Sequence, residues 1–166
     1  MPARTISVDF LTSSYRVVGN LAIANSGVMG VLSDSTCSYL EVRNANMARI
    51  HMANKLVEQA AVVRVVKQQV IAICMARRED VAIPRPGYAR TNKYPLRLTT
   101  PIYELEGTFE WPGRFDFTLI MSDGANEFVP MYDASLGAIL FPSLLIQSPV
   151  ILVNRSYVIS MVQVNE

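Results

Sequence analysis

A pattern of aromatic, glycine and apolar residues occurs twice in this chain of 166 residues, and its two copies lie 88 or 89 residues apart. The first copy covers residues 15–73 and the second covers residues 103–161. The matched positions are Tyr15 with Tyr103, Gly19 with Gly107, Ser33-Asp34 with Ser122-Asp123, Asn44 with Asp133, and Val70 with Val158. We expect the changes of spacing to fall between strand-like runs, where loops and bulges absorb them. The pattern favours a tandem duplication, although two β-rich segments can also align once gaps are allowed.

The composition indicates a protein that buries apolar surface against other copies. The length fits one ordinary domain or two small ones. Hydrophobic residues make up 51% of the chain and charged residues only 17%, so a monomer would expose a large apolar area. We therefore expect a homo-oligomer. The most apolar segment, residues 136–152, is interrupted by Pro142 and Pro149, so we expect no membrane span, and a cytoplasmic location is the default.

Short runs rich in β-branched and alternating apolar residues predict five or six strands in each copy. In the first copy the expected strands are residues 5–11, 15–24, 39–43, 61–67 and 70–76, the last two forming a hairpin around Gln68-Gln69. In the second copy they are residues 96–111 with a bend at Pro101, 115–121, 127–132, 136–141, 150–153 and 157–162. Residues 47–59 contain good helix formers, but their counterpart contains Pro142, so we expect strand in both copies.

These strands predict an all-β fold with minor helix, built as two tandem small β-barrel-like repeats, which could pack as a pseudo-dimer. The first repeat is expected over residues 1–80 and the second over residues 95–166. Between them, residues 81–94 contain Pro84, Pro86 and Gly87 among polar residues, which is typical of a linker.

The size, strand content and short turns of each copy resemble the small barrels of the Sm-like and SH3-like kind. Residues 113–161 are also similar to repeats of uncharacterised bacterial proteins. The resemblance covers most of the chain and lies in its overall pattern. An Sm-like barrel implies assembly into rings or filaments by pairing of edge strands, and it implies RNA as a ligand. The net charge of +1 argues against RNA.

Residues that could carry catalysis or bind a metal are sparse. The single histidine, His51, has no nearby set of cysteine or acidic ligands, and we expect it in a core or an interface. Cys37 and Cys74 lack metal-ligand spacing and are expected to be buried, reduced thiols. The recurring Ser-Asp pairs and the residues Asn44 and Asp133 are typical of turns and strand ends. We therefore expect no enzyme activity, no cofactor and no metal.

Three functional hypotheses follow. The first is a structural protein that assembles through strand edges and through an apolar stretch whose candidate contact residues are Leu136, Ile139, Leu140, Phe141, Leu144, Leu145 and Ile146. The second is a nucleic-acid-binding module that uses the basic and aromatic residues Arg85, Tyr88, Arg90, Lys93, Tyr94 and Arg97. The alternative for that linker is a solvated connector. The third is a sensor that holds a small ligand between the copies. Residues 1–83 carry a net charge of +3 and residues 84–166 a net charge of −2, which weakly favours contact between unlike copies.

Overall fold

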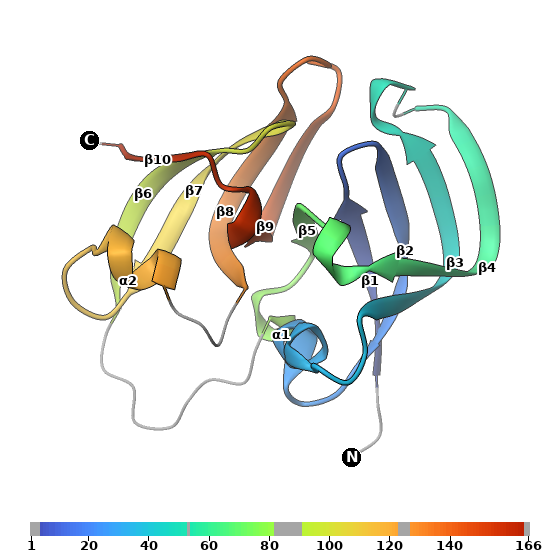
Figure 1. Cartoon of the computed structure of the whole chain (residues 1–166), viewed down its shortest axis with the longest axis horizontal. Coiled ribbons are helices and arrows are strands. Elements are labelled where there is room, and N and C mark those ends of the chain that lie inside the picture. The colour runs from blue at the N-terminus through green and yellow to red at the C-terminus, as the bar shows by residue number, and fades with distance from the viewer. Residues whose placement is uncertain (1–3, 53, 82–90, 123–126, 165–166) are drawn as a thin grey trace.

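The computed structural model describes residues 4–52, 54–81, 91–122 and 127–164, which form one antiparallel sheet of ten strands (Figure 1). The strands are β1 (Arg4–Leu11), β2 (Tyr15–Ile23), β3 (Tyr39–Arg49), β4 (Leu56–Val66), β5 (Ala72–Met75), β6 (Asn92–Thr99), β7 (Tyr103–Trp111), β8 (Phe128–Ala138), β9 (Leu145–Asn154) and β10 (Ser160–Gln163). Their order in the sheet is β10-β6-β7-β8-β9-β5-β1-β2-β3-β4. The predicted mainly-β fold is confirmed, and its strands form one continuous sheet.

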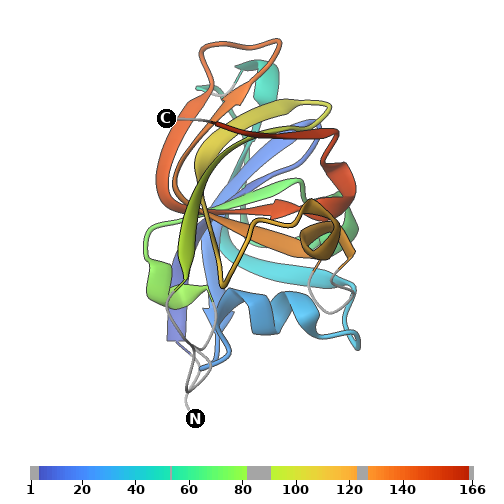
Figure 2. The ribbon, with the colours of Figure 1, turned by 90° about the vertical axis from the view of Figure 1, so that its left-hand side faces the viewer.

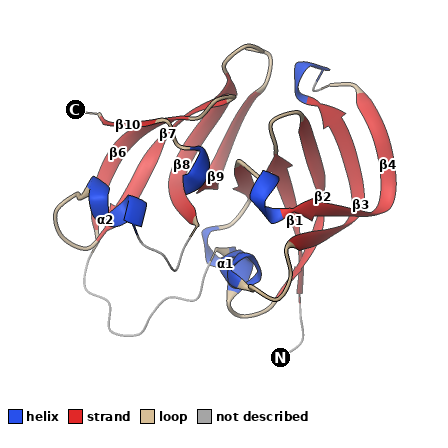
Figure 3. Cartoon of the chain, in the orientation of Figure 1, coloured by secondary structure: helices blue, strands red, loops and turns tan. Residues whose placement is uncertain are grey.

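The two halves of the sheet repeat the same arrangement of elements. In the first half the order is β5-β1-β2-β3-β4, and in the second it is β10-β6-β7-β8-β9. Each half has one short α-helix between its second and third strands: α1 (Gly27–Ser33) and α2 (Phe117–Ser122). Each also has a 3-10 turn before its last strand: η2 (Lys67–Gln69) and η4 (Arg155–Tyr157). The remaining 3-10 turns are η1 (Ile50–Met52) and η3 (Arg78–Asp80), and all the helical segments are short connections at the ends of strands (Figure 3).

Two hydrophobic cores lie on either side of β5 and β9. Ile73 of β5 and Leu152 of β9 belong to the core of the first half, while Ala72 and Ile151 belong to the core of the second half. Successive side chains of a strand point to opposite faces, so β5 and residues 150–154 of β9 are buried on both faces. They form a shared wall between the two halves, which curve away from each other on its two sides (Figure 1).

Glycines allow the third strand of each half to approach the second closely where the two strands pair. A Cβ atom on Gly19 would lie 2.6 Å from Cγ1 of Val42, and one on Gly107 would lie 2.8 Å from Cβ of Ala134. Opposite these glycines the strand register shifts, and Asn44 and Asp133 have φ angles of 49° and 47°. Asparagine and aspartate tolerate this left-handed conformation better than most residues. Both residues therefore lie at bulges within strands, rather than at the strand ends that we expected.

The spacing between the copies changes a second time, from 89 back to 88 residues, and this change lies inside β4. Met47 pairs with Glu58 and Ala48 pairs with Leu56, so Val57 forms a bulge in β4. The corresponding residues of β8 and β9 pair without interruption. The expectation that each change of spacing falls between strands was wrong for this one, because a bulge inserts one residue without ending the ladder.

Four predictions of local structure were wrong. Residues 61–67 and 70–76 do not form a hairpin, because η2 redirects the chain and β5 pairs with β1 and β9 instead. Residues 47–59 are divided by η1. Residues 96–111 form two strands, since the Thr100 hydroxyl accepts from Tyr103 N at 2.9 Å and closes a turn. The strand expected at residues 115–121 is the helix α2, whose start is capped by Asp116, which accepts from Thr118 N at 2.9 Å.

Candidate self-association site

The sheet has two edges, β4 and β10. Among the residues that the structure describes, β4 pairs only with β3, and β10 pairs only with β6. The two strands lie on opposite sides of the molecule, as Figure 1 shows, and Figure 2 looks onto the side that carries β10. Each edge therefore leaves one row of backbone donors and acceptors available to another chain.

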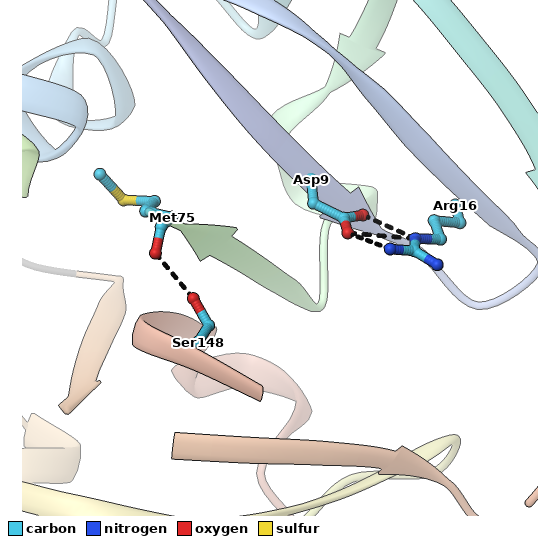
Figure 4. A network of polar contacts seen from close by, with 4 residues as sticks. All are labelled: Asp9, Arg16, Met75 and Ser148. Atoms are coloured by element: carbon cyan, nitrogen blue, oxygen red, sulfur yellow. Dashed lines mark hydrogen bonds and ion pairs between the residues drawn. The ribbon is translucent and has the colours of Figure 1, made fainter. Parts of the chain in front are cut away.

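The two halves are joined by an antiparallel ladder between β5 and β9, which we call the internal joint. Ala72 pairs with Val153, and Met75 pairs with Val150. Side chains extend this ladder at both ends: Ser148 Oγ donates to the carbonyl of Met75 at 2.7 Å (Figure 4), and Asn154 Nδ2 donates to that of Val70 at 2.9 Å. All residues of β5 and residues 150–154 of β9 are buried, so the joint contains no solvent-exposed residue at its centre.

A charged pair lies beside this joint. The carboxylate of Asp9 accepts two hydrogen bonds from Arg16 Nε, at 3.1 and 3.0 Å, and one from Nη2 at 2.7 Å (Figure 4). Burial raises the pKa of Asp9 above its ordinary value of 3.8, although the hydrogen bonds and the positive charge of Arg16 act in the opposite direction. Burial likewise raises the pKa of the Cys74 thiol and of the Tyr103 hydroxyl. The Cys74 thiol and the Tyr103 hydroxyl therefore hold their protons more tightly than the free groups do.

Apolar side chains are exposed along the two free edges. Val162 of β10 is 51% exposed and Val66 of β4 is 47% exposed, while Ile159, which precedes β10, is 66% exposed. Their counterparts in the internal joint are Cys74, Asn154 and Ile71, all of which are buried. The same positions are thus covered where the two halves meet and open where the sheet ends.

The hairpin tips of the two halves also expose apolar groups. Leu140 is 77% exposed and Leu145 is 65% exposed at the end of β8 and the start of β9. Met52 and Leu56 are 41% and 54% exposed at the matching tip of the first half. The two tips touch through His51 and Phe141, whose ring centroids are 6.0 Å apart. His51 is exposed, so it is not a core residue, and it lies where the two halves meet.

The structure divides the seven apolar residues that the sequence singled out for self-association. Leu136 and Leu144 are buried in the core of the second half, and Phe141 and Ile146 are half-buried against it. Ile139, Leu140 and Leu145 are exposed at the hairpin tip. Sequence reasoning missed the edge residues of β4 and β10. A usable signal was present, since Ala72–Met75 is apolar at all four positions whereas Ser160–Gln163 begins and ends with a polar residue.

The candidate nucleic-acid residues are only partly described. Arg85, Tyr88 and Arg90 lie outside the described residues, and Lys93, Tyr94 and Arg97 belong to β6, which begins at Asn92. Arg97 Nε donates to Glu106 at 2.8 Å. The hydroxyl of Tyr94 donates to the carbonyl of Gly113, and its ring packs against Phe115 with centroids 5.5 Å apart. Tyr94 and Arg97 therefore have partners within the chain.

The described residues also form a hollow with a partly polar lining. A cavity of about 460 Å³ lies between the halves, where Lys67 of the first half and Glu127 of the second contribute to its lining. Lys67 is already engaged, since its Nζ donates to the carbonyl of Asp34 at 2.9 Å. In the described part of the chain, no three histidine, cysteine, aspartate or glutamate residues are grouped as metal ligands would be. Cys74 is a buried free thiol and Cys37 a half-buried one.

Comparisons with known proteins leave the site to be interpreted from its own geometry. No family model matches the sequence, no curated protein matches it, and no solved structure matches the fold. None of the helices in the described residues is both long enough and apolar enough to cross a membrane.

Proposed function

We propose that this protein is a structural protein that self-assembles, each chain acting as a duplicated barrel-like unit of a homo-oligomeric scaffold. The observation that carries this proposal is the open sheet, which ends on opposite sides of the molecule in two strands with exposed apolar side chains. Strand edges of this kind attract further strands, and natural proteins usually protect them with charge, proline or a covering element. β4 carries the exposed charges Glu58 and Arg64, but Val162 and Val66 themselves are uncovered, and a second copy of the chain would cover them.

The likeness of the two halves supports the duplicated unit. Backbone hydrogen bonds recur at matched positions: Lys67 N donates to Ser38 O at 2.9 Å, and Arg155 N donates to Glu127 O at 2.8 Å. Another matched pair joins Ile71 N to Leu11 O and Ile159 N to Thr99 O, both at 2.8 Å. Each half has five strands with a 3-10 turn before the last. In the described residues, each half has one edge strand that is paired on one side only, so the unit is suited to the addition of further chains.

A pair of matched variants tests the proposal. Val162→Lys places a charge on the edge strand β10, and Leu119→Lys places the same charge on the helix α2, which is not an edge strand; the two native side chains are equally exposed, at 51%. The first variant is expected to reduce the native mass measured by light scattering, and the second to leave it unchanged. Both should keep the wild-type circular dichroism spectrum. An unchanged mass for Val162→Lys would show that this edge does not carry the assembly.

The described residues favour this function over the two other hypotheses. Arg97 and Tyr94 are occupied by Glu106 and Gly113, which reduces what they can offer to a nucleic acid. The cavity between the halves has Lys67 on its wall, and that ammonium already has a backbone partner.

A further inference from the structure

We infer that the internal joint is repeated between chains: β10 of one chain pairs antiparallel with β4 of the next, with Val162 opposite Val63. This inference rests on the proposed self-association and adds to it a defined partner strand, direction and register. The partner is a second copy of this chain, because the structure already contains one example of the joint, formed between its two halves.

The first argument is the equivalence of the strands. In sheet order β5 precedes β1 as β10 precedes β6, and β4 follows β3 as β9 follows β8. The internal joint pairs β5, the first strand in the order of the first half, with β9, the last strand in the order of the second half. The two strands left over are β10, which is equivalent to β5, and β4, which is equivalent to β9. The backbone edges that form the joint inside the chain thus occur a second time, divided between its two ends, with Arg64 in place of Leu152 among the side chains.

The register follows from the internal joint. There, Ile73 pairs with Leu152 and Cys74 pairs with Ile151. Their counterparts, 88 residues away, are Met161 with Arg64 and Val162 with Val63. The equivalence of these positions is fixed by the strand ladders, since Ala45 pairs with Ala60 in the first half as Ala134 pairs with Ser148 in the second. The joint between chains therefore runs from Ser160 opposite Val65 to Gln163 opposite Val62.

The directions of the side chains agree with this register. In the internal joint, Ile73 faces the core of its own half and Cys74 faces the core of the other half. Met161, the counterpart of Ile73, already packs against the core of its own half. Val162, the counterpart of Cys74, is 51% exposed and is free to face the next chain. Val63 packs against the core of the first half, so Val162 would extend that core.

The hairpin tips supply a second contact at the same joint. Inside the chain, His51 meets Phe141, and their counterparts are Leu140 and Met52. The tips match in their backbone bonds, since Lys55 N donates to Met52 O at 2.9 Å and Leu144 N donates to Phe141 O at 3.0 Å. Met52 lines a hollow of about 250 Å³ with Leu56. Leu140, 77% exposed in the single chain, would be covered by Met52 of the next chain.

The joint is heterologous, because it brings together two different surfaces. Such contacts generate a closed ring when the rotation between copies closes and a filament when it does not. A symmetric pairing of β10 with β10, or of β4 with β4, would instead stop at a dimer. Cysteine cross-linking separates these arrangements.

The experiment introduces one new cysteine into each of two co-expressed chains, in a Cys37→Ser background that keeps the buried Cys74. One chain carries Val162→Cys and the other carries Val63→Cys. Residues directly opposite each other in an antiparallel pair have Cα atoms about 4.5–5.5 Å apart, within the range that a disulfide spans. Mild oxidation is expected to give a mixed disulfide-linked dimer, with twice the 18.4 kDa mass of one chain. Each variant expressed alone is expected to remain unlinked.

A control variant tests the register. With Arg64→Cys in place of Val63→Cys, cross-linking should fall by about tenfold, because neighbouring side chains of a strand point to opposite faces. Equal cross-linking in this control, or cross-linking of one variant alone, would overturn the inferred joint. An oligomer by light scattering in which the Val162→Cys and Val63→Cys chains stay unlinked would also overturn the joint while leaving the proposed self-association intact. A monomeric wild type would overturn both.

Discussion

The hydroxyl of Tyr103, a residue of the second half, donates a hydrogen bond of 2.6 Å to the carbonyl of Thr12 in the first half. The side chain of Tyr103 is buried, so the bond is shielded from water. Removing a partner of a buried hydrogen bond costs about 1–3 kcal/mol when the other group remains unsatisfied. We expect Tyr103→Phe to lower the free energy of unfolding by about this amount, as chemical denaturation can measure. Tyr15→Phe, at the matching position of the first half, should affect folding less; an equal loss would contradict a special role of Tyr103 at the internal joint.

The glycines at the strand crossings give a second prediction. A methyl group on Gly19 or Gly107 would lie under 3.0 Å from atoms of the neighbouring strand. Such overpacking typically costs about 1–3 kcal/mol, and we expect Gly19→Ala and Gly107→Ala to be destabilised to this extent in urea denaturation. The control is Gly137→Ala, whose new methyl group would lie 3.8 Å from Leu145 and should be tolerated. Equal stability of all three variants would show that the close crossing is not needed.

The charged pair beside the internal joint predicts a dependence of stability on pH. Because burial raises the pKa of Asp9 above its ordinary 3.8, the folded chain holds the proton more tightly than the unfolded chain. Protonation of Asp9 therefore favours folding, and this contribution is lost as the pH rises through the pKa of the folded state. Relative to Asp9→Asn, which does not titrate, the wild type should lose stability as the pH is raised from about 4 toward neutrality. Denaturation of both proteins across this range provides the measurement, and a relative gain by the wild type would contradict the prediction.

The exposed hairpin tip gives a prediction for association alone. Leu140→Glu would place a carboxylate against Met52 of the next chain, and we expect a rise in the dissociation constant of about tenfold or more, equivalent to about 1.4 kcal/mol. Leu140 is 77% exposed, so the unfolding of dissociated chains should be unchanged. Dilution experiments followed by light scattering measure the association. An unchanged dissociation constant would remove Leu140 from the interface.

The sequence predicted the mainly-β content of the fold better than it predicted which strands pair. The copies were visible because Tyr15 and Gly19 recur as Tyr103 and Gly107 at turns and crossings, where few residues fit. The strand pairing was not visible, because β5 follows β4 after only the 3-10 turn η2 and residues 70–71 and still pairs with β1 and β9. Local pattern predicts a hairpin there, whereas the ladder depends on contacts distant in sequence. The same reason explains the candidate site: hydropathy selected Leu136 and Leu144, which are core residues, and overlooked Val162 at the edge.

The native mass of the wild-type chain, measured by light scattering at low and high salt over a range of concentrations, tests the central claim most directly. Strand pairing and apolar burial depend only weakly on ionic strength, in contrast to contacts between exposed charges. We predict a discrete multiple of 18.4 kDa, or a size distribution that grows with concentration, and little change with salt. A monomer of 18.4 kDa under all conditions would contradict self-assembly through β4 and β10.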